Sequence, residues 1–134
     1  MLRIPLFIIS AVNIAAGAVV AGLYVSARGG GGVPVIVLFI GLALFVQGAY
    51  TVGYLRGWWS RSGGRATQLL VAGESTALLV GALGTLQGIL YNLHPRNGDQ
   101  EFGPLMAATL FATHAVVGLV YAARNERFAA RGGT

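Results

Sequence analysis

Each of the four long apolar stretches of this 134-residue chain contains a strongly polar side chain, and these are Asn13, Gln47, Glu74 and His114. Hydrocarbon makes polar side chains expensive to bury, so such residues are candidates for function. Glu74 is the most informative, because the other three acidic residues fall in expected loops or in the tail. A carboxyl group in a low dielectric resists ionisation, which suits carriage of a proton or capture of a cationic ligand. The structural alternatives are a neutral or paired Glu74 that is hydrogen-bonded to Asn13, Gln47 or a nearby hydroxyl, or one shallow enough to meet cytoplasmic water.

His114 has three open interpretations: an axial ligand of haem b, a proton carrier, or a hydrogen-bond donor between helices. A haem clamped between helices generally needs two axial ligands, and the second histidine, His94, falls at the far end of its apolar stretch. This spacing argues against haem and favours the hydrogen bond. Two tyrosines share a helical face with Gln47. The candidate ligand or proton site therefore comprises Glu74, His114, Asn13, Gln47, Tyr50 and Tyr54.

The sequence contains few signs of redox, metal-binding, phosphate-binding or nucleophilic sites. The chain has no cysteine, which removes disulfide exchange and thiolate metal sites. It also has no glycine-rich loop with a phosphate-binding lysine, no metal-ligand spacing on one helix and no nucleophile elbow. We therefore expect no catalytic residues, no metal and no cofactor.

The elements that must position these side chains are four long apolar stretches. The chain is 55% hydrophobic and 10% charged, with a mean hydropathy of +0.70, whereas a soluble domain carries about 25% charged residues. A bilayer core of about 30 Å needs about 20 apolar residues in a helix. Continuous rather than alternating apolarity favours helices over a membrane barrel. The predicted spans are residues 4–26, 33–55, 69–93 and 104–123. Short connections predict an all-α, up-down antiparallel four-helix bundle that forms one transmembrane domain over residues 1–134.

The arginines predict an orientation. The formal net charge is +5, and seven of the nine arginines fall on one side of a four-span topology, with Arg28 and Arg96 on the other. The positive-inside rule then places both termini in the cytoplasm, and we expect a prokaryotic cytoplasmic membrane. Trp58 and Trp59 are expected at that same surface, and Tyr24 and Tyr91 at the outer one. The first span is longer than the apolar region of a typical signal peptide, which favours an uncleaved helix.

The positive charge does not predict nucleic-acid binding, because these arginines lie between apolar spans rather than on one folded face. Arg56, Arg61 and Arg65 could also bind anionic lipid headgroups, but orientation in the membrane is the simpler interpretation of their positions.

Helical spacing groups the polar and small residues into faces. Asn13, Gln47, Glu74 and His114 could share one cavity in the inner half of the membrane. A helix-packing seam is predicted on the third span, with Glu74 and Gln87 at its edges, and consists of Gly73, Ala77, Gly81, Gly84 and Gly88. The fourth span offers a small face of Ala108, Ala112, Ala115 and Ala122, with His114 towards its flank. Small residues at this spacing let helices approach closely, either within the chain or against another one.

Three classes of function remain open. The favoured one is a non-catalytic accessory or interaction subunit of a membrane complex, because the chain has many small residues, short loops and no recognisable catalytic constellation. The alternative is a small oligomeric transporter or channel that uses the polar pocket around Glu74. The second alternative is a lipid- or quinone-binding protein or an enzyme within the membrane. The expected partners are the lipid bilayer and other membrane protein chains or further copies of this one, without nucleic acid.

Overall fold

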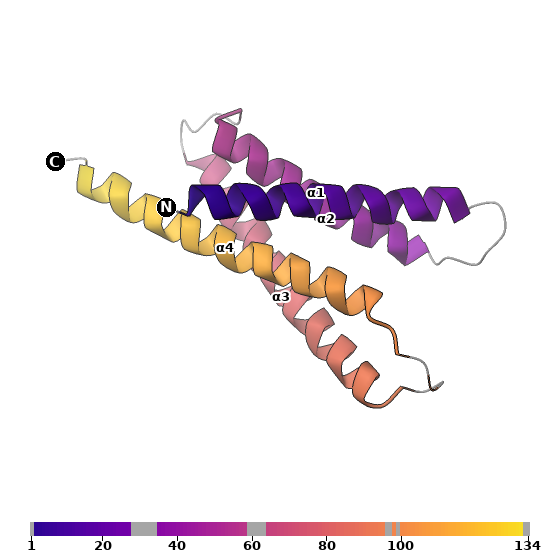
Figure 1. The fold of residues 1–134 in the computed structure, drawn as a ribbon. Helices are drawn as coiled ribbons and strands as arrows, with labels where there is room; N and C mark the ends of the chain where they lie inside the picture. The colour runs from indigo at the N-terminus through magenta and orange to yellow at the C-terminus, as the bar shows by residue number, and fades with distance from the viewer. Residues whose placement is uncertain (1, 28–34, 59–63, 96–97, 99, 133–134) are drawn as a thin grey trace. The chain divides into compact units, whose positions relative to one another are not determined.

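The computed structural model describes residues 2–27, 35–58, 64–95, 98 and 100–132, with the backbone alone from residue 126 onward. The described chain is all-helical, with α1 (Arg3–Ser26), α2 (Val35–Arg56), α3 (Arg65–Leu93) and α4 (Gly103–Gly132) (Figure 1). Each of the four is long enough and apolar enough to cross a membrane. The prediction of four apolar helices is therefore confirmed.

The helix boundaries have local causes. Gly57 has a φ of 76°, and the backbone N–H groups of Gly57 and Trp58 donate to the carbonyls of Tyr54 and Gly53. This is a Schellman motif, in which a glycine in the left-handed region ends the helix and satisfies its last carbonyls. α3 begins at Arg65 rather than at the predicted residue 69, directly after the left-handed Gly64.

The fourth helix is longer than its apolar stretch. It continues from the predicted end at residue 123 to Gly132, so Glu126 belongs to the helical backbone and not to an irregular tail. Backbone hydrogen bonds hold a helix together whether or not its side chains are apolar, so the end of apolarity does not end the helix.

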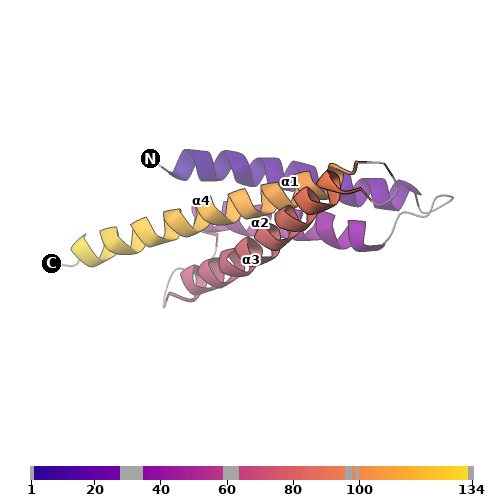
Figure 2. The ribbon, with the colours of Figure 1, turned by 90° about the horizontal axis from the view of Figure 1, so that it is seen from below.

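The chain divides into two helical units, Met1–Ala66 and Thr67–Thr134. In the first unit, α1 and α2 lie side by side (Figures 1 and 2). They are antiparallel, because Gly17 lies against Gly41 and Phe45, whereas Arg3 at the start of α1 donates to the carbonyl of Leu55 at the end of α2, at 2.7 Å.

The second unit pairs α3 with α4 (Figure 1). A Cβ built on Gly81 would lie 2.7 Å from the backbone nitrogen of Ala112, and one built on Gly88 would lie 3.0 Å from the Cβ of Leu105. Contacts that run forward on α3 and backward on α4 make this pair antiparallel as well. A single domain of four helices, and the orientation of the termini, stay predictions.

Some predicted features lie outside the described residues. They are the connection between the first two predicted spans, of which residues 28–34 are not described, and the residues Trp59, Arg28, Arg61, Arg96 and Asp99.

Candidate functional site

Glu74 lies deep within its helix. With α3 beginning at Arg65, it stands nine residues from the start, which is about two and a half turns. The side chain is almost completely buried, with 2% of the residue exposed. A shallow carboxylate in contact with bulk water, one of the alternatives from the sequence, does not fit this burial.

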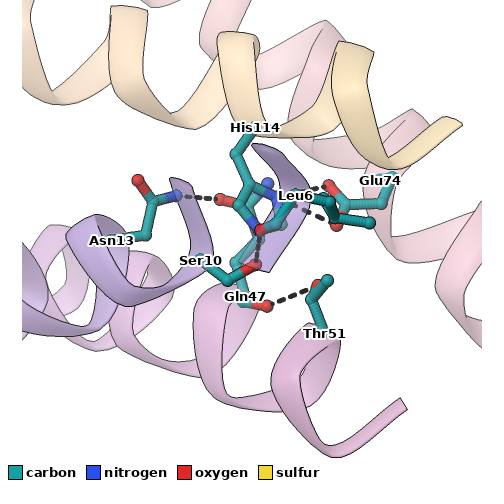
Figure 3. Close-up of polar contacts among 7 residues, drawn as sticks. All are labelled: Leu6, Ser10, Asn13, Gln47, Thr51, Glu74 and His114. Atoms are coloured by element: carbon teal, nitrogen blue, oxygen red, sulfur yellow. Dashed lines mark hydrogen bonds and ion pairs between the residues drawn. The ribbon is translucent and has the colours of Figure 1, made fainter. Parts of the chain in front are cut away.

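His114 of α4 lies next to Glu74, and Figure 3 shows the two side chains pointing toward each other. The Nδ1 atom of His114 lies 3.1 Å from Oε1 and 3.3 Å from Oε2 of Glu74, and the histidine is completely buried. Either an Nδ1–H donates to the carboxylate, or a protonated carboxyl donates to Nδ1. The geometry therefore accommodates one shared proton in two positions, between an acid and a base that both exchange protons.

Gly118 makes room for this pair. A Cβ built on Gly118 would lie 3.0 Å from both Cδ and Oε1 of Glu74 and 3.1 Å from its Cγ. Since His114 and Gly118 are four residues apart, they share one face of α4. The carboxyl group of Glu74 thus lies over one turn of α4, with the imidazole at one end and a bare backbone at the other.

A second polar pair joins the helices of the other unit. The Nδ2 atom of Asn13 donates to Oε1 of Gln47 at 2.8 Å (Figure 3). The Oδ1 atom of Asn13 is buried, and no described group donates a hydrogen bond to it. Next to this pair, the hydroxyls of Ser10 and Thr51 bond back to carbonyls four residues earlier in their own helices. Such bonds satisfy hydroxyl groups without linking helices.

The two tyrosines of the predicted site lie on α2. The hydroxyl of Tyr50 donates to the backbone carbonyl of Ala66 at 3.0 Å, which ties the start of α3 to α2. Tyr54 is buried, with 4% of the residue exposed. The structure thus brings Asn13 together with Gln47, and Glu74 together with His114. One cavity shared by both pairs stays a prediction.

The small-residue seam of α3 packs within its own unit. Gly81, Gly84 and Gly88 approach Ala112, Ala108 and Leu105 of α4 at 2.7–3.0 Å from their built Cβ positions. Ala77 is buried, whereas a Cβ on Gly73 would meet nothing within 4 Å. Gly73 therefore has no close neighbour among the described residues, and Glu74, predicted at the edge of the seam, lies against α4 instead. Packing of Gly73 against another helix stays a prediction. Ala115 and Ala122 of α4 are buried, as a small packing face requires.

Beyond the two polar pairs, we looked for a metal cluster and for a pocket among the described residues. No group of three His, Cys, Asp or Glu side chains is placed there to hold a metal ion. An open hollow of about 660 Å³ lies along the C-terminal half of α3, lined by Leu83, Leu86, Gln87, Leu90, Tyr91 and His94. It contains none of the six predicted site residues.

Sequence reasoning missed several residues that shape these pairs. Gly118 was not singled out, although its distance of four residues from His114 is a usable signal. Gly41 and Gly48 were also missed; their built Cβ atoms would lie 2.7 Å from the backbone nitrogen of Ala21 and 2.5 Å from the carbonyl of Ser10. Their spacing of seven residues places both on one helical face.

The function of the chain has to be argued from its own residues, because no known protein family, curated protein or solved structure matches it.

Proposed function

We propose that the chain is an integral membrane protein, with both ends in the cytoplasm, that conducts protons through the Glu74–His114 pair. Four helices of sufficient length and apolarity support insertion, and the position of seven of the nine arginines supports the orientation. Four helices enclose little room, so we expect the active form to be an oligomer.

The observation that carries this proposal is the buried contact of 3.1 Å between the carboxyl group of Glu74 and the imidazole of His114. Ionisable residues inside membrane spans are rare, are generally paired, and mark proton relays and ion pathways. A glutamate and a histidine can each release and take up a proton. An apolar contact would hold two helices together without the cost of burying these groups.

Proton flux in vesicles tests the proposal. The full-length protein is reconstituted into liposomes that enclose a pH-sensitive dye, and a potassium diffusion potential with valinomycin drives protons inward. We expect acidification faster than in protein-free vesicles. Glu74→Gln keeps the size and hydrogen-bonding capacity of the side chain but cannot exchange a proton, so this variant should fall to the protein-free rate.

Glu101→Gln is the matched control, because it makes the same chemical change at an exposed residue between α3 and α4. We expect it to conduct like the wild type. Wild-type flux in Glu74→Gln, or no flux above protein-free vesicles in the wild type, would contradict the proposal.

An accessory or interaction subunit is the second candidate. It is favoured by large apolar side chains of α3 that are more than half exposed, namely Leu79, Val80, Leu83 and Leu86. Either lipid chains or another membrane protein must cover this surface. However, three glycines of the α3 seam already pack against α4, so they do not offer a free surface for a partner. Native mass measurement after mild extraction tests this candidate: unlike chains that copurify in fixed ratio support it, and a homo-oligomer or a monomer contradicts it.

A further inference from the structure

The positive charge of the chain belongs to its first helical unit. Residues 1–66 contain five arginines and no acidic residue, whereas residues 67–134 contain four arginines and four acidic residues. The whole net charge of +5 therefore lies in the unit of α1 and α2. Within this unit no carboxylate is present to neutralise an arginine.

Two of these arginines are held at the same end of the α1–α2 pair. Arg3 of α1 donates from Nη2 to the carbonyl of Leu55, at the end of α2. Arg56 of α2 lies over the ring of Phe7 of α1, with 5.6 Å between its guanidinium carbon and the ring centroid. A guanidinium has five N–H donors, so the bond from Arg3 to Leu55 leaves most of its donors for a further partner.

The same end contains other groups that favour an anion. The first residue of α3, Arg65, is exposed, and its neighbour Ala66 is bonded by Tyr50 of α2. The N-terminus of α1 has no side-chain cap at Leu2 and no acidic residue in its first turn. Pro5 has no backbone N–H, but the N–H groups of Arg3 and Ile4 and the helix dipole attract negative charge to this terminus. The basic end of α1–α2, defined as Arg3, Arg56 and Arg65 with the first turn of α1, thus combines three guanidinium groups with a helix N-terminus.

We propose that the basic end of α1–α2 binds the phosphate group of an anionic phospholipid. A lipid is favoured over a soluble phosphate because exposed apolar side chains adjoin the arginines. Ile4 and Ile8 of α1 are 71% and 57% exposed, and Trp58, two residues after Arg56, is 69% exposed. Isoleucine surfaces suit acyl chains, and tryptophan is typical of the membrane–water interface. This proposal rests on the membrane insertion proposed above and is independent of proton exchange at Glu74.

Lipid binding to the purified full-length protein tests the proposal. Phosphatidylglycerol and phosphatidylcholine with identical acyl chains are titrated in detergent, and bound lipid is measured by native mass spectrometry. We expect the wild type to prefer phosphatidylglycerol. In a variant with Arg56→Gln and Arg65→Gln, we expect this preference to fall about fivefold per arginine, or about 25-fold in all.

The matched control removes the same two charges from the other unit, with Arg124→Gln and Arg127→Gln, and should keep the preference. Three results would overturn the proposal: an unchanged preference after loss of Arg56 and Arg65, an equal loss in the Arg124→Gln and Arg127→Gln control, or displacement of the lipid by inorganic phosphate. An equal loss on removal of Arg124 and Arg127 would mean that overall charge alone attracts the lipid.

Discussion

The close approach of α1 and α2 predicts a large difference between two glycines of the same helix. A Cβ added at Gly17 would lie 2.5 Å from the carbonyl oxygen of Gly41 and 2.5 Å from the backbone nitrogen of Phe45. A Cβ added at Gly22 would meet nothing within 4 Å. The variants Gly17→Ala and Gly22→Ala therefore make the same chemical change in a packed and in an open environment.

The expected magnitude follows from these distances. Carbon atoms in contact normally lie about 3.5–4.0 Å apart, so α1 and α2 would have to separate by about 1 Å around residue 17. Overpacking costs about 1–3 kcal/mol, and atoms of the backbone cannot rotate aside, which favours about 2–3 kcal/mol. The gain in helix propensity from glycine to alanine, about 0.5–1 kcal/mol, is common to both variants. We therefore expect Gly17→Ala to be less stable than Gly22→Ala by about 2–3 kcal/mol.

Thiol labelling can measure this difference, because the chain has no cysteine of its own. Ser10 is completely buried, and its backbone carbonyl lies 2.5 Å from the Cβ position of Gly48, so Ser10→Cys places a reporter at the α1–α2 interface. Where the helices close faster than the thiol reacts, the labelling rate follows the population of the open state. An exposed thiol from Ser26→Cys gives the rate without protection.

In the Ser10→Cys background, Gly17→Ala should label about 30- to 140-fold faster than Gly22→Ala, because each 1.4 kcal/mol is a factor of ten. Equal labelling rates in the two glycine variants would refute the close approach of the helices at Gly17. Full protection of the Ser10→Cys thiol in both glycine variants would also refute this close approach.

Three further results are expected. Gly118→Ala should displace the carboxyl group of Glu74, since its Cβ would lie 3.0 Å from Oε1; proton flux in vesicles should fall while the helical circular dichroism stays unchanged, and wild-type flux would argue against this positioning. A double-mutant cycle of Asn13→Ala and Gln47→Ala, read by thermal unfolding, should give a coupling of about 0.6–1.7 kcal/mol for their 2.8 Å hydrogen bond; additive effects would mean that the bond contributes nothing. Tyr50→Phe should lower the free energy of unfolding by about 0.5–1.5 kcal/mol, because it removes a hydrogen bond to the start of α3; an unchanged stability would contradict that role.

Hydropathy was sufficient to locate the helices, because a continuous apolar stretch of about 20 residues favours a helix over a strand. The predicted spans 4–26 and 33–55 differ by at most two residues from Arg3–Ser26 and Val35–Arg56. The helices extend beyond the predicted spans only at polar ends. Residues 65–68, in which Ala66 is the only apolar residue, are helical. The apolar part of α4, Gly103–Asn125, agrees with the predicted span 104–123, while its helical backbone continues to Gly132. Apolarity reports which residues a membrane could hold, whereas capping and backbone geometry decide where a helix ends.

The partners within the candidate site were harder to predict. A helical wheel shows which residues share a face, but it does not show which face meets which helix, or at what register. Hydrogen bonding of Glu74 to Asn13, Gln47 or a nearby hydroxyl was one expectation from the sequence, and the described contact is with His114. The four polar residues were expected at similar heights in the membrane, and this similarity did not single out His114 as the partner of Glu74.

The spacing of buried residues along each helix indicates which face packs against a neighbouring helix. On α2, five of the seven buried residues, Gly41, Leu44, Gly48, Thr51 and Leu55, are spaced at alternating intervals of three and four, and Gly53 and Tyr54 are buried beside them. On α1, the buried positions 6, 10, 13 and 17 show the same alternation.

The same alternation of three and four residues separates Glu74 from Gly73 on α3. Glu74 precedes Ala77, Gly81, Gly84 and Gly88 at alternating intervals of three and four, whereas Gly73 breaks the alternation. Intervals of three and four average 3.5 residues, the repeat with which helices keep one seam against a neighbour. A seam defined by this repeat includes Glu74 and excludes Gly73, in agreement with the burial of Glu74 and the open surroundings of Gly73. The carboxyl group therefore occupies a packing position, where a small residue opposite it is a steric necessity, and Gly118 meets that requirement.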